Sequence, residues 1–386
     1  MFGSLGDFVT RHRRKFIVTG VLVGGSFVAI KYAQRKLIEF QERQAREFFE
    51  KTRRMQHFES TERTCNQVIL SMSAELYSAI IRECSTDSLL EQLRQNPSNK
   101  LELWEKMKIV AFTRLTTFIY AASMLVLTLR VQLNLLGGYL YQDITTEKKQ
   151  ITDELKQQYL SLIQHFIQEG GLNELVRTIR AKVVAIMKPL PLTKRFSLSD
   201  LEQLFWTLQM SINSDVGDTN GKMATFLLPS QVPEYNLAGP LLQKMYSETL
   251  DLLESDDASS VCLNNICRGF SLTVDAIAES MGETVSLTQQ TAQPAAQDNV
   301  TSTQNNNASG GDNAAVAVKS SNNVLNINSI EMALAKLIPI VSGLTSKGFD
   351  QWTRPQNLAT SLITFYVLDE KSKVFGANVY ETFSST

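Results

Sequence analysis

The side chains that most often carry out chemistry are scarce in this sequence and are not spaced for it. The three histidines, His12, His57 and His165, lie in no HExxH motif and in no other spaced metal-ligand pattern. The stretch from Gly217 to Lys222 is one residue too short for a phosphate-binding loop, and Met223 stands where that loop needs Ser or Thr. The sequence therefore names no nucleophile, no base, no metal site and no cofactor.

The four cysteines are also poor candidates for chemistry. They are too few for a disulfide scaffold, and they form no CxxC pair. The offset between Cys262 and Cys267 suits neither a zinc site nor a redox pair. We expect all four to be reduced cytosolic thiols, most of them buried.

Trp104 is the residue that stands out. Lys100 and Lys108 lie one helical turn to either side of it, and Met107 belongs to a neighbouring apolar face. In one interpretation, Trp104 is a residue at the edge of the core, with its ring covered by lysine stems. In the other it is a binding hot spot, where a partner's amphipathic helix covers Trp104, Leu93 and Met107 while the lysines meet the partner's carboxylates.

Length and charge limit the classes of function. A chain of 386 residues with 43% hydrophobic content can bury a large core. Its 38 basic residues nearly balance 39 acidic ones, so the net charge is -1. A surface of this kind gives no general attraction for polyanions, and this disfavours nucleic-acid binding.

The amino terminus has basic residues on both sides of an apolar run. The uncharged residues 16–30 number 15, fewer than the roughly 20 that cross about 30 Å of hydrocarbon, so a span requires Lys15 and Lys31 to snorkel. Gly20 and Gly24 form a small-xxx-small spacing that lets another membrane helix approach. We predict a transmembrane anchor over residues 16–33. Its representative positions are Phe16, Val18, Gly20, Val23, Gly24, Phe27 and Ile30, and the basic cluster before it is Arg11, Arg13, Arg14 and Lys15.

Two alternatives compete with the anchor. A secretory signal peptide has the same charged and apolar regions, with small residues at Gly24, Gly25 and Ser26. The helical pattern that continues without a break after Ile30, together with the cysteine usage, argues against it. A buried core helix is the other alternative, and the basic residues on both flanks disfavour it. Because both flanks are positive, charge does not fix the orientation of the span.

Residues 26–96 contain neither glycine nor proline, so we predict one long helix there. Its residues 34–64 should form a largely solvated stalk, with only a thin apolar stripe of Ile38, Ala45, Phe48, Phe49 and Met55. From Cys65 onward a core face begins, so the globular body is predicted to cover residues 65–386.

A second long helix should start at Asn99, which with Glu102 has the form of a helix cap, and should stop at Gly137-Gly138. Its residues 115–129 are uncharged, so a second membrane span is an alternative to a helix buried in a bundle. Because Arg114 and Arg130 limit the run to 15 residues, we favour the buried helix.

The rest of the chain has helical spacing, which predicts an all-α fold, a bundle of long helices. We predict helices over residues 153–166, 172–187, 199–210, 241–253, 260–281, 330–341 and 356–383, the third of them opened by a capping box at Ser199 to Glu202. Residues 211–240 should be a long connection. Residues 289–323 consist mostly of Gln, Asn, Ser, Thr, Ala and Gly, which predicts a disordered insertion.

The chain resembles the peroxisomal biogenesis factor 3 (peroxin-3) family through most of its length. The weak stretches are residues 211–240 and the polar insertion. The resemblance is carried by His57-Phe58-Glu59-Ser60, Arg63-Thr64-Cys65-Asn66, Pro97 to Glu102 with Trp104, Leu129 to Asn134 with Gly137-Gly138-Tyr139, Gln157 to Leu160, Arg268 to Ser271, Leu334-Ala335-Lys336, Ile338 to Val341 and Ala377 to Tyr380.

The resemblance implies a lumenal segment at residues 1–15, one span in the peroxisomal membrane and a cytosolic helical bundle. It implies docking of the chaperone and import receptor peroxin-19, which delivers newly made membrane proteins, by recognition of an amphipathic helix near its amino terminus. The implied groove includes Leu93, Lys100, Trp104, Met107 and Lys336, and Gly138 looks structural. A tether for organelle inheritance or autophagy adaptors is the second hypothesis, and an enzyme is the third.

Overall fold

The computed structural model describes residues 13–216, 220–230, 239–291, 330–345 and 357–385, and these are almost entirely α-helical. In those ranges the extended structure is limited to β1 (Arg195–Phe196) and β2 (Met332–Ala333), which pair antiparallel with Arg195 opposite Ala333. The predicted all-α class is confirmed. The helices are α2 (Arg13–Glu83), α3 (Asp87–Arg94), α4 (Lys100–Thr146), α5 (Asp153–Ser161), α6 (Gln164–Ile167), α7 (Gly171–Met187), α8 (Leu198–Val216), α9 (Asn220–Leu227), α10 (Gly239–Leu253), α11 (Asp256–Thr291), α12 (Leu334–Leu344), α13 (Leu358–Leu368) and α14 (Glu370–Ser384).

The chain divides into two compact units, Met1–Ser60 and Thr61–Thr386. The described part of the first unit is the amino-terminal part of α2, where residues 30–50 are all exposed, including Ile38, Phe48 and Phe49 of the predicted apolar stripe. Arg11 lies outside the described residues. The rest of the predicted anchor is helical, but side chains are described there only from Ser26 on, and Phe27 and Ile30 are exposed. The anchor itself therefore stays a prediction.

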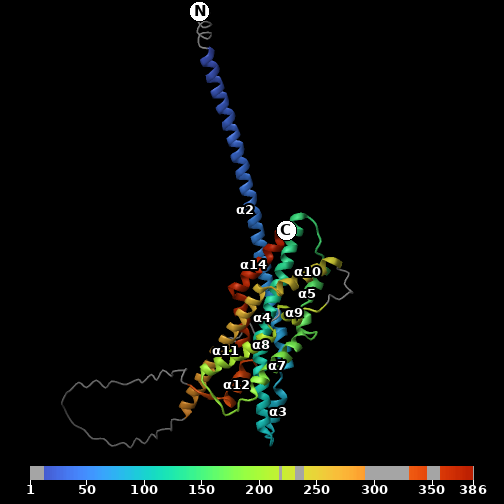
Figure 1. The fold of residues 1–386 in the computed structure, drawn as a ribbon, viewed down its shortest axis with the longest axis vertical. Helices are drawn as coiled ribbons and strands as arrows, with labels where there is room; N and C mark the ends of the chain where they lie inside the picture. The colour runs from blue at the N-terminus through green and yellow to red at the C-terminus, as the bar shows by residue number, and fades with distance from the viewer. Residues whose placement is uncertain (1–12, 217–219, 231–238, 292–329, 346–356, 386) are drawn as a thin grey trace, which may run out of the picture. The chain divides into compact units, whose positions relative to one another are not determined.

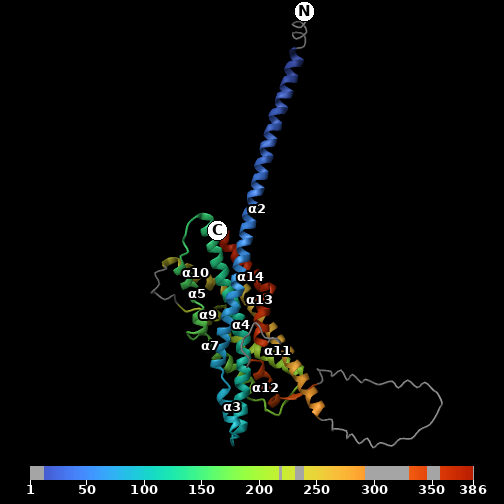
Figure 2. The ribbon, with the colours of Figure 1, turned by 180° about the vertical axis from the view of Figure 1, so that it is seen from behind.

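The second unit is built around α4. This helix runs lengthwise through the bundle and packs against α14, α7, α12 and α11 (Figure 1; Figure 2 shows the opposite side). Residues 111–139 of α4 are all buried. Among the described residues, α4 is the one helix long and apolar enough to cross a membrane, yet 89% of its most apolar window is covered by the rest of the chain. The favoured interpretation of residues 115–129 as a buried bundle helix agrees with this packing.

The long helix predicted for residues 26–96 is interrupted. It ends at Glu83, and α3 starts at Asp87. Ser85 lies in the break, where its Oγ accepts a hydrogen bond from the Asp87 amide at 3.3 Å, as polar residues at helix starts often do. A Ser-Thr-Asp sequence can therefore end a helix without glycine or proline.

The predicted stop at Gly137-Gly138 is wrong, because α4 continues to Thr146 and ends where Glu147 takes a left-handed conformation with φ of 54°. The two glycines instead allow close packing. An added Cβ would lie 2.6 Å from Thr61 Cγ2 at Gly137 and 2.6 Å from Phe383 Cβ at Gly138. The space is needed by the neighbouring helices and not by a turn.

Two predicted caps also differ from the structure. Asn99 is the residue before α4, but its side chain makes no capping hydrogen bond. The capping box of α8 lies at Ser197 and Asp200, where the Ser197 amide donates to Asp200 Oδ2 at 2.9 Å and the Asp200 amide donates to Ser197 Oγ at 3.2 Å. The box is two residues earlier than predicted because Leu198 is already helical.

Two predicted non-helical segments are partly helical. In residues 211–240, α8 continues to Val216 and α9 covers Asn220–Leu227. In the predicted insertion, α11 reaches Thr291, so residues 289–291 are helical. Residues 292–323 lie outside the described residues, and there the insertion stays a prediction.

We expect Gly138→Ala to lower the free energy of unfolding by about 2 kcal/mol, because the new methyl group overpacks against Phe383. Gly282→Ala in α11 is the matched control, since an added Cβ there meets nothing within 4 Å. It should raise the stability by up to about 1 kcal/mol through helix propensity. Thermal unfolding followed by circular dichroism checks both. Equal effects at the two glycines would show that packing at Gly138 is not limiting.

Candidate partner-binding site

Most of the predicted partner-binding residues lie on α3 and the first turns of α4, and Lys336 lies on α12. Leu93 on α3 and Trp104 on α4 are both half-buried and pack against the core, and the two helices contact each other. Met107 is buried beneath this surface, with 2% of its area exposed. The structure thus places Trp104 between core and solvent, as the sequence predicts.

Two further apolar side chains on these helices were not predicted from the sequence. Leu101, one turn before Trp104, is 70% exposed, and Leu90, one turn before Leu93, is 42% exposed. The signal that could have found them is the three-residue spacing, which puts each on the same helical face as its larger neighbour. We refer to Leu90, Leu93, Leu101 and Trp104 as the apolar surface.

Lys100 and Lys336 both have exposed side chains and make no ion pair within the described ranges. Lys100 lies one turn before Trp104 on α4. Lys336 is in α12, which packs against α4. Other charges near the apolar surface are paired within their own helices, Glu102 with Lys106 at 2.7 Å and Glu91 with Arg94 at 3.5 Å. Lys100 and Lys336 therefore remain available to a partner's carboxylates.

The prediction that Lys108 lies at the rim of the groove is wrong. Its side chain is fully buried, and Nζ donates to the carbonyl oxygen of Leu190 at 2.7 Å and contacts Glu105 Oε2 at 2.5 Å. Helical spacing placed Lys108 one turn from Trp104 but could not show that the loop after α7 covers it. Lys108 supports the surface from below and is not free to meet a partner.

The same loop also holds the start of α12. The Ala335 amide donates to the Leu192 carbonyl at 2.9 Å, and the Leu334 amide donates to the Lys194 carbonyl at 2.8 Å. Because Lys108 binds this loop from α4, the loop joins α4 to α12. The position of Lys336 is thereby fixed relative to the first turns of α4.

Arg114 secures the same region from inside the bundle. Its guanidinium is 3% exposed and donates to Thr345 Oγ1 at 2.9 Å, to the Ser342 carbonyl at 2.8 Å and to Thr86 Oγ1 at 3.4 Å. Burial lowers the pKa of Arg114, although an arginine stays charged at any ordinary pH. Thr86 directly precedes α3, and Ser342 lies near the end of α12. One buried cation thus connects the helices that carry Leu93, Trp104 and Lys336.

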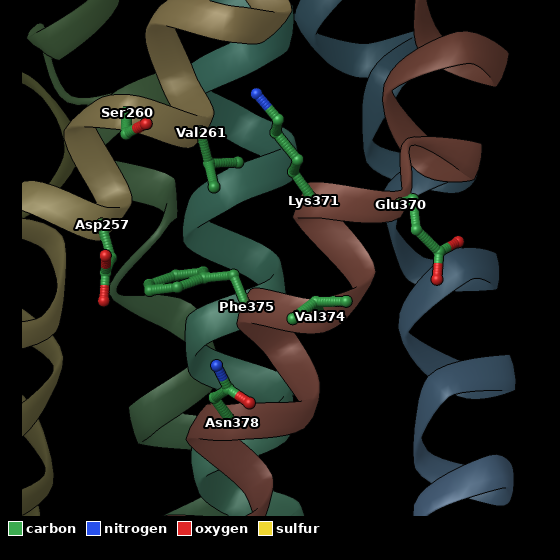
Figure 3. A pocket seen from close by; sticks show the side chains of 8 residues that line it. All are labelled: Asp257, Ser260, Val261, Glu370, Lys371, Val374, Phe375 and Asn378. Atoms are coloured by element: carbon green, nitrogen blue, oxygen red, sulfur yellow. The ribbon is translucent and has the colours of Figure 1, made fainter.

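Two cavities lie elsewhere in the described part of the chain, and neither brings reactive groups together. A cavity of about 290 Å³ lies between α11 and α14, and Figure 3 shows Lys371 and Glu370 extending away from each other at its rim, with Phe375 inside. A second cavity, of about 310 Å³, lies between α8 and α11 beside Trp206 and Cys267. Within the described residues, no group of three or more His, Cys, Asp or Glu side chains is placed to hold a metal ion.

Comparison with known proteins identifies the family. A family model described as Peroxin-3 matches residues 7–101, 95–143 and 140–351. Peroxisomal biogenesis factor 3 of Mus musculus is 34% identical over 403 residues, covering all of this chain and 98% of the mouse protein. The Homo sapiens protein of the same name is 34% identical over 404 residues with the same coverage. Peroxisome biogenesis protein 3-1 of Arabidopsis thaliana is 26% identical over 279 residues, which are 65% of this chain and 77% of the plant protein.

The chain belongs to the peroxin-3 family. It is thus a member of a family of peroxisome biogenesis factors, which is not a known family of enzymes. The matched ranges include Leu93, Lys100, Trp104 and Lys336, so the whole candidate site lies within the part of the chain that resembles other members of the peroxin-3 family.

The cysteines of this peroxin-3 family member differ sharply in exposure. Cys65, Cys84 and Cys262 are free and buried, while Cys267 is free and exposed and accepts a hydrogen bond from Gln209 Nε2 at 2.8 Å. Burial raises the pKa of the Cys65 thiol to about 12 and the pKa values of Cys84 and Cys262 to about 11. These three thiols therefore stay protonated at neutral pH.

We expect a maleimide to label Cys267 alone in the native chain at neutral pH, because the other thiols are both covered and protonated. Intact mass spectrometry should show a single adduct, and full modification should appear only after denaturation. Cys267→Ser is the control and should remove the native adduct. Rapid native labelling of a second cysteine would contradict the packing around α4.

We expect Arg114→Ala to lower the free energy of unfolding by about 3 kcal/mol, since it leaves the hydrogen-bond partners on α12 unsatisfied inside the bundle. Arg177→Ala is the matched control. Arg177 is an exposed arginine paired with Glu174 on α7, and its loss should change stability by less than about 0.5 kcal/mol. Urea unfolding followed by circular dichroism measures both, and comparable losses would rule out a special role for Arg114.

Proposed function

We propose that this member of the peroxin-3 family is a membrane-anchored docking receptor for the chaperone and import receptor peroxin-19. The observation that carries the proposal is the apolar surface on α3 and α4, with half-buried Trp104 and exposed Leu101 beside lysines that have no ion pair in the described part of the chain. Docking there would support insertion of membrane-protein cargo and assembly of the peroxisomal membrane.

Recognition of a helix by a groove fits the chemistry of this surface. An amphipathic helix near the amino terminus of peroxin-19 would place its apolar face on Leu93, Leu101 and Trp104, removing their exposed area from water. Tryptophan is prominent among residues that dominate such interfaces, because its large ring excludes water from a wide contact. Met107 lies beneath and supports the ring without reaching solvent.

Lys100 and Lys336 would supply the electrostatic part of recognition. Both are exposed, and they sit on two different helices that the loop after α7 joins. Carboxylates on the partner helix can meet them at the rim, where charge mainly increases the association rate and fixes the orientation of the bound helix. Lys108 contributes only by holding that loop.

The proposed location is the peroxisomal membrane, with a single pass at residues 16–33, the amino terminus in the lumen and the bundle in the cytosol. The support is the basic-apolar-basic pattern of residues 11–36 and the helical conformation from Arg13 onward. In the part of the chain that the structure describes, the other long apolar helix, α4, is buried inside the bundle and so is not available to lipid. Membrane lipids and, indirectly, cargo proteins are then the other partners.

We expect Trp104→Ala to weaken binding of the amino-terminal segment of peroxin-19 about 30-fold or more, which corresponds to about 2 kcal/mol, because the main apolar contact is lost. The full chain in lipid nanodiscs would be titrated with the labelled segment and followed by fluorescence anisotropy. Trp206→Ala is the matched control, since Trp206 is 62% exposed on α8, away from α3. It should leave the affinity unchanged.

Circular dichroism would establish that both variants are folded. Wild-type chain that does not bind the segment would overturn the docking proposal and favour a tether for other adaptors. Equal losses of affinity in the two variants would leave the docking proposal in place but would show that Trp104 is not part of the binding site.

A further inference from the structure

One face of α2 in the first unit carries a row of large apolar side chains with no cover. The row consists of Ile30, Leu37, Ile38, Phe48, Phe49 and Met55, which are between 55% and 70% exposed. At 100° per residue, all six fall within an arc of about 120°. This is the width of the face that an amphipathic helix normally buries against something else.

The opposite face has its own partners. Lys36 Nζ lies 3.1 Å from Glu39 Oε2, and Arg46 Nη2 lies 3.5 Å from Glu42 Oε2, both pairs within the helix and exposed. Charges paired in this way one turn apart suit a solvated surface. This side also carries exposed Tyr32 and Phe40, but its charges suit water, and the row holds most of the large apolar side chains that need a neighbour.

Lipid is a poor candidate for that neighbour. The helix is continuous from Arg13 to Glu83, and residues 30–55 extend it by about 38 Å. An unbroken helix that crosses the membrane at residues 16–33 carries the row away from the bilayer, so only its first turn can touch lipid. Bending the row onto the membrane surface would require a break in backbone hydrogen bonds, and residues 26–96 contain no glycine or proline that would favour one.

The sequence along this face has the spacing of a paired helix. Starting at Gly24, alternate steps of three and four residues select one side of α2, which is the heptad spacing that keeps a seam facing a parallel partner. Gly20 lies on the same side one step earlier, so the small residues of the anchor continue into the row. We call this side the seam, and its members are Gly24, Phe27, Lys31, Gln34, Ile38, Gln41, Ala45, Phe48, Thr52 and Met55.

We propose that two copies of this chain pair in parallel along the seam. A second copy is anchored in the same membrane in the same direction, so its seam runs alongside in the same register, and identical residues meet about a two-fold axis. Polar seam residues such as Gln34 and Gln41 then face their own copies and can hydrogen-bond to each other, which fixes register in parallel pairs. The pairing rests on the membrane anchor of the proposed function.

The available area is adequate for a pair held in one membrane. Ile38, Phe48 and Met55 lie on the seam, and Ile30, Leu37 and Phe49 flank it at adjacent heptad positions. Covering on the order of 100 Å² on each of these six side chains would bury roughly 600 Å² per partner, below the roughly 800 Å² of a standard interface. Confinement of both copies to one bilayer raises their effective concentration, so a modest interface is enough. Docking at Trp104 and pairing through the seam use different parts of the chain.

Cysteine cross-linking in the full chain tests the pairing. Phe48→Cys places a thiol on the seam, and Arg46→Cys places one about 160° away on the polar face. Both are made in the Cys267→Ser chain, which removes the exposed native thiol. The variants are reconstituted at low density in phosphatidylcholine vesicles and oxidised with copper phenanthroline, and covalent dimer is followed over time.

We expect Phe48→Cys to form covalent dimer at least about tenfold faster than Arg46→Cys, because only the seam holds two thiols together. Equal rates, or no dimer at either position, would overturn the pairing. A Phe48→Trp chain whose added fluorescence is strongly quenched by brominated lipid would overturn it as well, since the row would then lie on the membrane. Release of the wild-type chain by alkaline carbonate would overturn the anchor itself, a result separable from failure of pairing alone.

Discussion

The bundle depends on the complete burial of residues 111–139 of α4. Residues 111–139 give about eight helical turns without an exposed side chain, so the two charged groups that they carry, Arg114 and Arg130, must find partners inside the protein. Arg130 is the clearest case. Its guanidinium is fully buried and donates to Glu62 Oε1 at 2.6 Å and to the Val367 carbonyl at 2.6 Å, joining α4 to α2 and to the end of α13. Breaking such a contact leaves an uncompensated charge in the core, which is strongly destabilising, so these cations select which helices can lie against α4.

The same requirement positions the candidate site. Toward the start of α4, Arg114 connects to Thr86 before α3 and to the end of α12, and Lys108 holds the loop after α7. The apolar surface therefore lies on α3 and α4, whose relative positions are fixed by buried hydrogen bonds, although its own side chains remain partly exposed. Such a surface loses little conformational freedom when a partner binds, which favours affinity without additional contact area. If the proposed docking occurs at this surface, stability and recognition are linked, because Arg114 and Lys108 of the single helix α4 hold the elements that carry it.

The sequence was sufficient for those features that depend on periodicity along one helix. The buried run of α4, the exposed stalk and the half-buried position of Trp104 all follow from which residue types recur at helical spacing. The sequence was not sufficient where contacts with a distant part of the chain determine whether a residue is buried or a helix continues. Lys108 has the spacing of a rim lysine, but the loop with Leu190 covers it. Gly137 and Gly138 have the form of a helix stop, yet Thr61 and Phe383 occupy the space that a side chain would fill, and the helix continues. Ser199 satisfies the pattern of a capping box as well as Ser197 does, and only the position of Leu198 at the start of α8 distinguishes them.

Residues 16–30 and residues 115–129 show why composition alone does not identify what surrounds a helix. Each is an uncharged run of 15 residues with basic side chains just outside, and each is compatible with lipid or with a protein core. For residues 115–129, the flanking Arg114 and Arg130 turn inward to carbonyl and hydroxyl groups of other helices, so the cover is protein. The flanks of residues 16–30 contain clustered cations on a helix whose next turns are exposed, a pattern suited to lipid headgroups. What decides between the two environments is where the flanking charges find their partners. The exposed apolar row of α2 poses the same question, since its residues also need a cover. The continuity of that helix beyond the proposed span favours protein and not lipid as the cover.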